Sequence, residues 1–98
     1  DRAAWVVAER QRIERTLRDR MERAEIEGRP SIPIVHSDGN FVWLPVGERA
    51  DDLHAHIVEH ARVLPRVYSG EGVRCTVIEA EHNDRVIDAV SEWATSVG

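Results

Sequence analysis

Residues 66–78 have the sequence Arg-Val-Tyr-Ser-Gly-Glu-Gly-Val-Arg-Cys-Thr-Val-Ile, and this pattern predicts a β-hairpin. Two short runs rich in β-branched and aromatic residues flank a polar segment, residues 69–72, that contains two glycines. Glycine adopts positive φ without steric cost, which suits a tight connection between antiparallel strands. Side chains alternate between the two faces of a strand, so the second run has an apolar face. That face consists of Val73, Cys75 and Val77.

Two arginines of this hairpin fall on its polar positions. Arg66 shares a face of the first run with Tyr68, and Arg74 shares a face of the second run with Thr76. The planar guanidinium group matches carboxylate or phosphate oxygens bidentately, so two such groups on a rigid sheet would suit anion recognition. The simpler interpretation, which the spacing alone favours, is two arginines on a solvated sheet face.

Residues 1–27 carry an apolar stripe at helical spacing and predict one long helix. Gly28 and Pro30 are typical of the segment that follows a helix end. Oppositely charged residues four apart, such as Arg10 and Glu14, predict ion pairs along the other face. The stripe lacks strict heptads, so packing on its own domain, or bridging to another, is favoured over a coiled coil. The stripe residues are Val6, Ile13, Leu17, Met21 and Ala24.

The remaining segments predict alternating pairs of strands and single helices. Strands are expected at residues 31–35, 41–46, 63–68 and 73–78, and helices at residues 50–61 and 81–97. The helical stripes consist of Leu53, Ile57 and Ala61 in the first of these helices, and of Val86, Val90, Trp93 and Val97 in the second. In the run at 41–46, consecutive residues are apolar rather than every second one, which predicts a strand buried on both faces.

The resulting order is α-β-β-α-β-β-α, which indicates the α+β class. We expect one domain over residues 1–98, in which residues 31–98 form an α/β sandwich of helices on a small, mixed or mostly antiparallel sheet. A chain of 98 residues is long enough for one small domain and too short for two.

The composition limits the partners and the chemistry. The formal net charge is −5, so nucleic acid is not an expected partner, and no apolar run approaches the roughly 20 residues of a membrane span. Cys75 is the only cysteine, which excludes an internal disulfide and suits a reducing, cytoplasmic location. All 13 basic residues are arginine, so the chain has no lysine amine for covalent catalysis.

Residues 56–60 match H-x-x-E-H, the inverted zinc-peptidase signature. His56 and His60 are one helical turn apart and could share a zinc ion, with Glu59 beside them as a base. The chain is small for such an enzyme, and a strand rather than a ligand-bearing helix is expected next. We therefore predict no metal centre and an exposed cluster of His54, His56 and His60 that binds metal only adventitiously.

Three segments have a more specific pattern when they are taken in order: Asn40-Phe41-Val42-Trp43-Leu44, then residues 66–77, then Glu81-His82-Asn83-Asp84. With the arginine-rich helix that precedes them, they resemble the C-terminal part of fold type I pyridoxal-phosphate-dependent aminotransferases. The resemblance is to the histidinol-phosphate and aromatic amino-acid branch in particular, and it covers nearly the whole chain.

The resemblance implies that the chain is the small domain of such an enzyme, with residues 1–27 as a linking helix from a large domain. It implies that Arg74 binds the substrate α-carboxylate and that Arg66 lies near the distal end of the substrate. The pyridoxal phosphate, its lysine and most of its binding groups would belong to the large domain. The chain would thus contain no catalytic residue and be inactive alone.

The implied parent enzyme transfers an amino group between an amino acid and a 2-oxo acid, and works as a homodimer. An alternative from another class is a free-standing regulatory α+β module that uses the same two arginines to bind an anion. It would fold and bind its ligand without a large domain.

Overall fold

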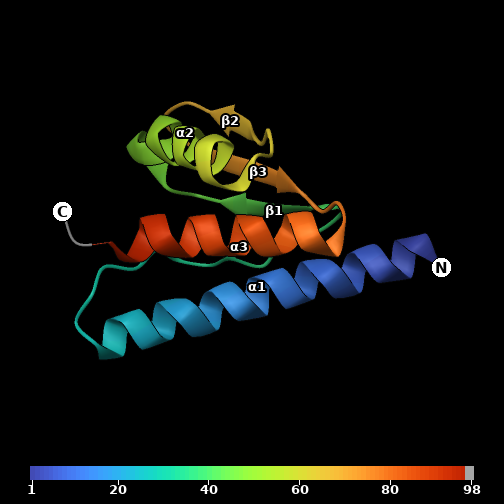
Figure 1. Cartoon of the computed structure of the whole chain (residues 1–98), viewed down its shortest axis with the longest axis horizontal. Helices are drawn as coiled ribbons and strands as arrows, with labels where there is room; N and C mark the ends of the chain where they lie inside the picture. The colour runs from blue at the N-terminus through green and yellow to red at the C-terminus, as the bar shows by residue number, and fades with distance from the viewer. Residues whose placement is uncertain (97–98) are drawn as a thin grey trace.

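The computed structural model describes residues 1–96, so the predicted stripe residue Val97 lies outside the described part of the chain. Its elements are α1 (Arg2–Ile26), β1 (Phe41–Leu44), the short 3₁₀ helix η1 (Gly47–Arg49), α2 (Ala50–Ala61), β2 (Arg66–Tyr68), β3 (Gly72–Thr76) and α3 (Ala80–Thr95). The strands form one antiparallel sheet in the order β1-β3-β2. The α+β class is confirmed, with helices packed on a small sheet (Figure 1).

Helix α1 begins and ends where its local chemistry requires. The Asp1 carboxylate accepts a hydrogen bond from the Ala3 N–H at 2.8 Å, which caps the first turn. Gly28 adopts a φ of 73°, and the N–H of Arg29 returns to the Ala24 carbonyl at 2.7 Å, which closes the last turn. Four of the five predicted stripe residues are buried, and Val6 is partly buried against the same core.

The segment between α1 and β1 corrects one prediction, because residues 31–35 form no strand. Pro33 lacks an N–H, and the Ile32 N–H lies 3.5 Å from the Met21 sulfur rather than facing a neighbouring strand. Farther along, the Ser37 N–H donates to the Glu14 carboxylate at 2.9 Å. The segment therefore runs along α1, whose side chains take the place of a strand partner.

The sheet has one buried face and one open face. Val42, Leu44, Val73 and Cys75 are buried and lie on the same side of β1 and β3. Phe41 and Trp43 alternate with them and are only half-buried. The expectation that residues 41–46 are buried on both faces is therefore wrong. The strand also ends at Leu44, because Pro45 has no N–H with which to continue the ladder.

Helices α2 and α3 complete the core. Helix α2 has the predicted bounds, and its stripe residues Leu53, Ile57 and Ala61 have no exposed surface. In Figure 1, α3 runs between α1 and the strands, and α2 lies beside β2 and β3. The α3 stripe residues Val86, Val90 and Trp93 are buried as predicted. Of the described helices, none is long and apolar enough to cross a membrane.

Several charged residues of α1 contact other elements of the fold. The Arg10 guanidinium donates to the Gly39 carbonyl at 2.6 Å, so the predicted Arg10–Glu14 pair is not formed. Arg12 holds both oxygens of the buried Glu9 carboxylate at 2.7 and 2.8 Å and also pairs with Asp84 of α3 at 2.8 Å. These contacts tie α1 to its neighbours, because ion pairs and hydrogen bonds between elements restrict their relative position.

Candidate functional site

A row of three side chains crosses the open face of the sheet. Arg74 of β3 is paired with Trp43 of β1 on one side and with Arg66 of β2 on the other. Directly paired residues of antiparallel strands point to the same face, with Cβ atoms about 5 Å apart. The two arginines singled out in the sequence are therefore brought together, and Trp43 joins them.

Aromatic rings surround the Arg74 guanidinium. Its central carbon lies 5.2 Å from the centre of the Phe41 ring and 5.8 Å from that of Tyr68. The Arg66 guanidinium lies 5.4 Å from the Tyr68 ring, and Tyr68 meets Trp43 edge-on, with ring centres 5.8 Å apart. Such rings attract a cation weakly and restrict its motion, so they orient the guanidinium without neutralising its charge.

The three rings and Arg74 border a shallow, open hollow of about 310 Å³. Its lining consists of Phe41, Trp43, Tyr68, Glu71 and Arg74. Within residues 1–96, the rings are the partners that the structure shows for Arg74, and neither it nor Arg66 has a carboxylate partner. The Arg12 guanidinium, by contrast, is already paired with the carboxylates of Glu9 and Asp84. The hollow therefore presents the N–H donors of Arg74, which have no carboxylate partner among residues 1–96, beside aromatic surface. This combination suits a small anion with an apolar body.

The backbone around the hollow depends on two glycines with different roles. Gly70 has a φ of 79° and provides the turn that the sequence predicts. Gly72 belongs to β3, and a Cβ there would overlap the Leu44 carbonyl oxygen and lie 2.7 Å from the Trp43 ring. Gly72 is thus needed for close packing rather than for positive φ, and this packing sets the Trp43 indole beside Arg74.

Cys75 lies on the opposite, buried face of β3. Burial raises the pKa of its thiol to about 12, so the thiolate is scarce at neutral pH. This cysteine packs as a core residue and has no access to the hollow, since side chains alternate between faces.

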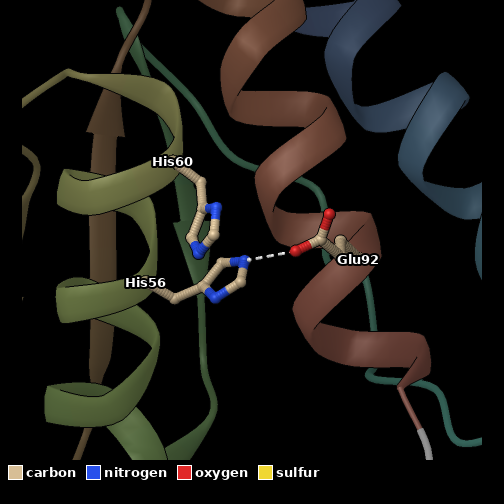
Figure 2. Close-up of side chains that lie close together, drawn as sticks. All are labelled: His56, His60 and Glu92. Carbon is tan, nitrogen blue, oxygen red and sulfur yellow. Dashed lines mark ion pairs between the residues drawn. The ribbon is translucent and has the colours of Figure 1, made fainter.

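The histidine motif of residues 56–60 is arranged differently from the peptidase signature. His56 and His60 stack with ring centres 4.0 Å apart, and the carboxylate that reaches them is Glu92 of α3 rather than Glu59 (Figure 2). His54 is held elsewhere, with its Nε2 atom 3.1 Å from the Pro65 carbonyl oxygen. Glu92 has no signal in the sequence, because only the packing of α3 on α2 brings it close.

Comparison with known proteins adds a second line of evidence. None of the protein-family models matches the chain. The aromatic amino acid aminotransferase of Mycobacterium avium is 36% identical over 88 residues, which are 90% of this chain and 22% of that protein. The enzyme of the same name from Corynebacterium jeikeium is 36% identical over 99 residues, which cover the whole chain and 25% of that protein. The chain is thus similar in sequence to part of these aromatic amino acid aminotransferases.

A third relative of the same name, from Mycobacterium tuberculosis, is 35% identical over 94% of the chain and 23% of its own length. The chain thus spans about a quarter of the length of the aminotransferases that it matches. The alignment with the Corynebacterium jeikeium aminotransferase includes the hairpin and all three helices, since it covers the whole chain. The likeness therefore supports an aminotransferase-type domain.

Proposed function

We propose that this chain is the small, C-terminal domain of a pyridoxal-phosphate-dependent aminotransferase and that Arg74 binds the α-carboxylate of its substrate. The main observation behind the proposal is that the Arg74 guanidinium has no carboxylate partner among residues 1–96. It lies on the open face of the sheet, near the rings of Phe41 and Tyr68. The aminotransferase names of the homologous proteins support the reaction class.

Arg74 would act by orientation. Two parallel N–H donors of its guanidinium bind the two oxygens of a carboxylate, which fixes the plane and direction of the substrate. A rigid strand and flanking rings reduce the entropy lost when the substrate is bound, because the guanidinium is already restrained. Arg66, on the neighbouring strand, would face the distal end of the substrate.

The cofactor would be held by other residues of the protein. Pyridoxal phosphate supplies an electron sink for the substrate α-carbon and is bound covalently through a lysine. All 13 basic residues of this chain are arginine, so its residues do not fit covalent attachment of that cofactor. We therefore assign this chain to substrate binding and expect it to be inactive without the cofactor-binding part of a homodimeric parent enzyme.

The substrate class follows from the surroundings of Arg74. Three aromatic side chains line the hollow, and apolar or aromatic substrate bodies pack well against such rings. Together with the relatives' names, this favours aromatic amino acids and their 2-oxo acids. A histidinol-phosphate-type substrate is the second candidate, because Arg66 offers a second cationic group for a distal phosphate.

The test is steady-state kinetics of the full-length protein that contains this chain. Arg74→Ala should lower kcat/KM for an aromatic amino acid by about 100-fold or more, since a bidentate charge-assisted contact is lost. Arg74→Lys should restore little activity, because an ammonium group cannot reproduce the planar fork. Arg18→Ala, at an exposed position of α1, is the matched control and should leave kcat/KM unchanged.

Two outcomes would remove parts of the proposal. Unchanged kinetics in Arg74→Ala would exclude the carboxylate role. Binding of 2-oxo acids to the 98-residue chain alone, at physiological concentrations and lost in Arg74→Ala, would instead favour a free-standing anion-binding module. Comparison of phenylalanine with histidinol phosphate in Arg66→Ala separates the substrate classes, because only the phosphate substrate should lose affinity strongly.

A further inference from the structure

A second cluster of side chains lies away from the arginine row, between α2 and α3. His56 and His60 project from α2 toward α3, where Glu92 meets them (Figure 2). One potential ligand atom from each residue lies within 4.8 Å of the other two. We propose that His56, His60 and Glu92 form a binding site for a zinc-class divalent metal ion that joins the two helices.

The residue types suit such an ion. Imidazole nitrogen and carboxylate oxygen are the ligands that zinc takes in many three-ligand sites, which leave a further position for water. Histidines four residues apart on a helix lie on the same face, so α2 presents both rings in one direction. Glu92 adds the negative charge that a pair of neutral imidazoles lacks.

The geometry is close to that of a bound state. Ligand atoms about 2.0 Å from a tetrahedral zinc ion are separated by about 3.3 Å. The His56 Nε2 atom and the nearer Glu92 oxygen are 3.4 Å apart, which matches this separation. The stacked rings, with centres 4.0 Å apart, keep the His60 nitrogens within reach, so rotation of exposed side chains completes the site.

One buried atom of the cluster also lacks a hydrogen bond. The His56 Nε2 atom is buried and forms no hydrogen bond of good geometry in the described part of the chain. A buried polar atom without a hydrogen bond is costly, and a metal ion would satisfy it. The substrate-binding role of the arginine row does not use these residues, since they lie on α2 and α3.

The test is calorimetric titration of the chelator-treated 98-residue chain with zinc chloride. We expect one zinc ion per chain, with His60→Ala weakening binding by about 100-fold. Glu92→Gln should weaken it at least tenfold, whereas Glu59→Gln, the matched carboxylate control, and His54→Ala should bind as the wild type does. Both ligand variants lie at exposed positions, so their folding is preserved.

A second readout separates a site that spans two helices from a pair of histidines on α2 alone. Zinc at about 100 times its dissociation constant should raise the melting temperature by roughly 10 °C, and the chelator should reverse this rise. The rise should be much smaller in Glu92→Gln. Zinc binding that is unaffected by Glu92→Gln, or weakened instead by Glu59→Gln, would overturn the proposed ligand set, and absence of stoichiometric binding would overturn the site.

Discussion

Arg66 and Arg74 are directly paired residues of β2 and β3, so the sheet places two positive charges side by side on its open face. Like charges at such positions repel each other. The neighbouring rings attract each guanidinium, but among residues 1–96 no carboxylate partner is provided. The pair therefore contributes repulsion to the free energy of folding, and a bound anion would offset this repulsion.

The repulsion between these two arginines can be measured by a double-mutant cycle. Arg66→Gln, Arg74→Gln and the double variant should give a repulsive coupling of about 0.2–1 kcal/mol in the free energy of unfolding at low salt. The coupling should shrink at 1 M sodium chloride, because salt screens exposed charges. The cycle cancels a contact that only one arginine makes, such as that of Arg74 with Phe41, whereas the Tyr68 ring contacts both guanidinium groups. A coupling near zero at low salt would mean that the two guanidinium groups do not face each other.

Gly72→Ala should destabilise the chain by about 2–4 kcal/mol in urea unfolding. The added methyl group would overlap the Leu44 carbonyl oxygen and crowd the Trp43 ring, so the strands would have to separate. Gly28→Ala is the control, since its Cβ would meet nothing within 4 Å and only the φ of 73° is unfavourable. Its cost should be about 1 kcal/mol. Equal costs at the two positions would contradict the close packing at Gly72.

Glu9 should make stability depend on pH. Its hydrogen bonds with Arg12 lower the pKa of the carboxyl below its ordinary value, and burial opposes this only in part. A carboxyl whose pKa is lower in the folded state stabilises the fold above its unfolded pKa, and this stabilisation is lost as the pH falls through the folded pKa. Glu9→Gln should therefore destabilise the chain by about 1–3 kcal/mol at pH 7, and by progressively less below about pH 4.

Urea unfolding at a series of pH values gives this comparison. Glu79→Gln is the control, because that carboxylate is exposed and only loosely paired with Arg2 at 3.4 Å. It should follow the wild type at every pH. A constant difference between Glu9→Gln and the wild type down to pH 3 would show that the carboxylate charge is not what stabilises this contact.

The sequence predicts much of this fold because its patterns are local. The α2 stripe and the alternation along β3 correctly indicate the helix bounds and the face that carries Arg74. The expected strand at residues 31–35 is wrong, because the side chains of α1 that replace a strand partner are distant in sequence.

The sequence likewise predicts the local features of the site and not its long-range contacts. Alternation places Arg66 and Arg74 on polar faces, but their direct pairing, and the presence of Trp43 beside them, depend on strand order and register. No local pattern encodes those long-range relationships. Glu92 was missed for the same reason, since it approaches His56 only when α3 packs on α2.

The division of the sheet into a buried face and an open face has an evolutionary consequence. The side chains at positions 41, 43, 66, 68 and 74 lie outside the apolar core, so under the proposed substrate-binding role, selection on ligand preference and selection on folding would act on different residues. A gene library that randomises these five positions should remain largely folded while its ligand preferences diversify. Gly72 is the exception, because a single methyl group there disturbs both properties at once.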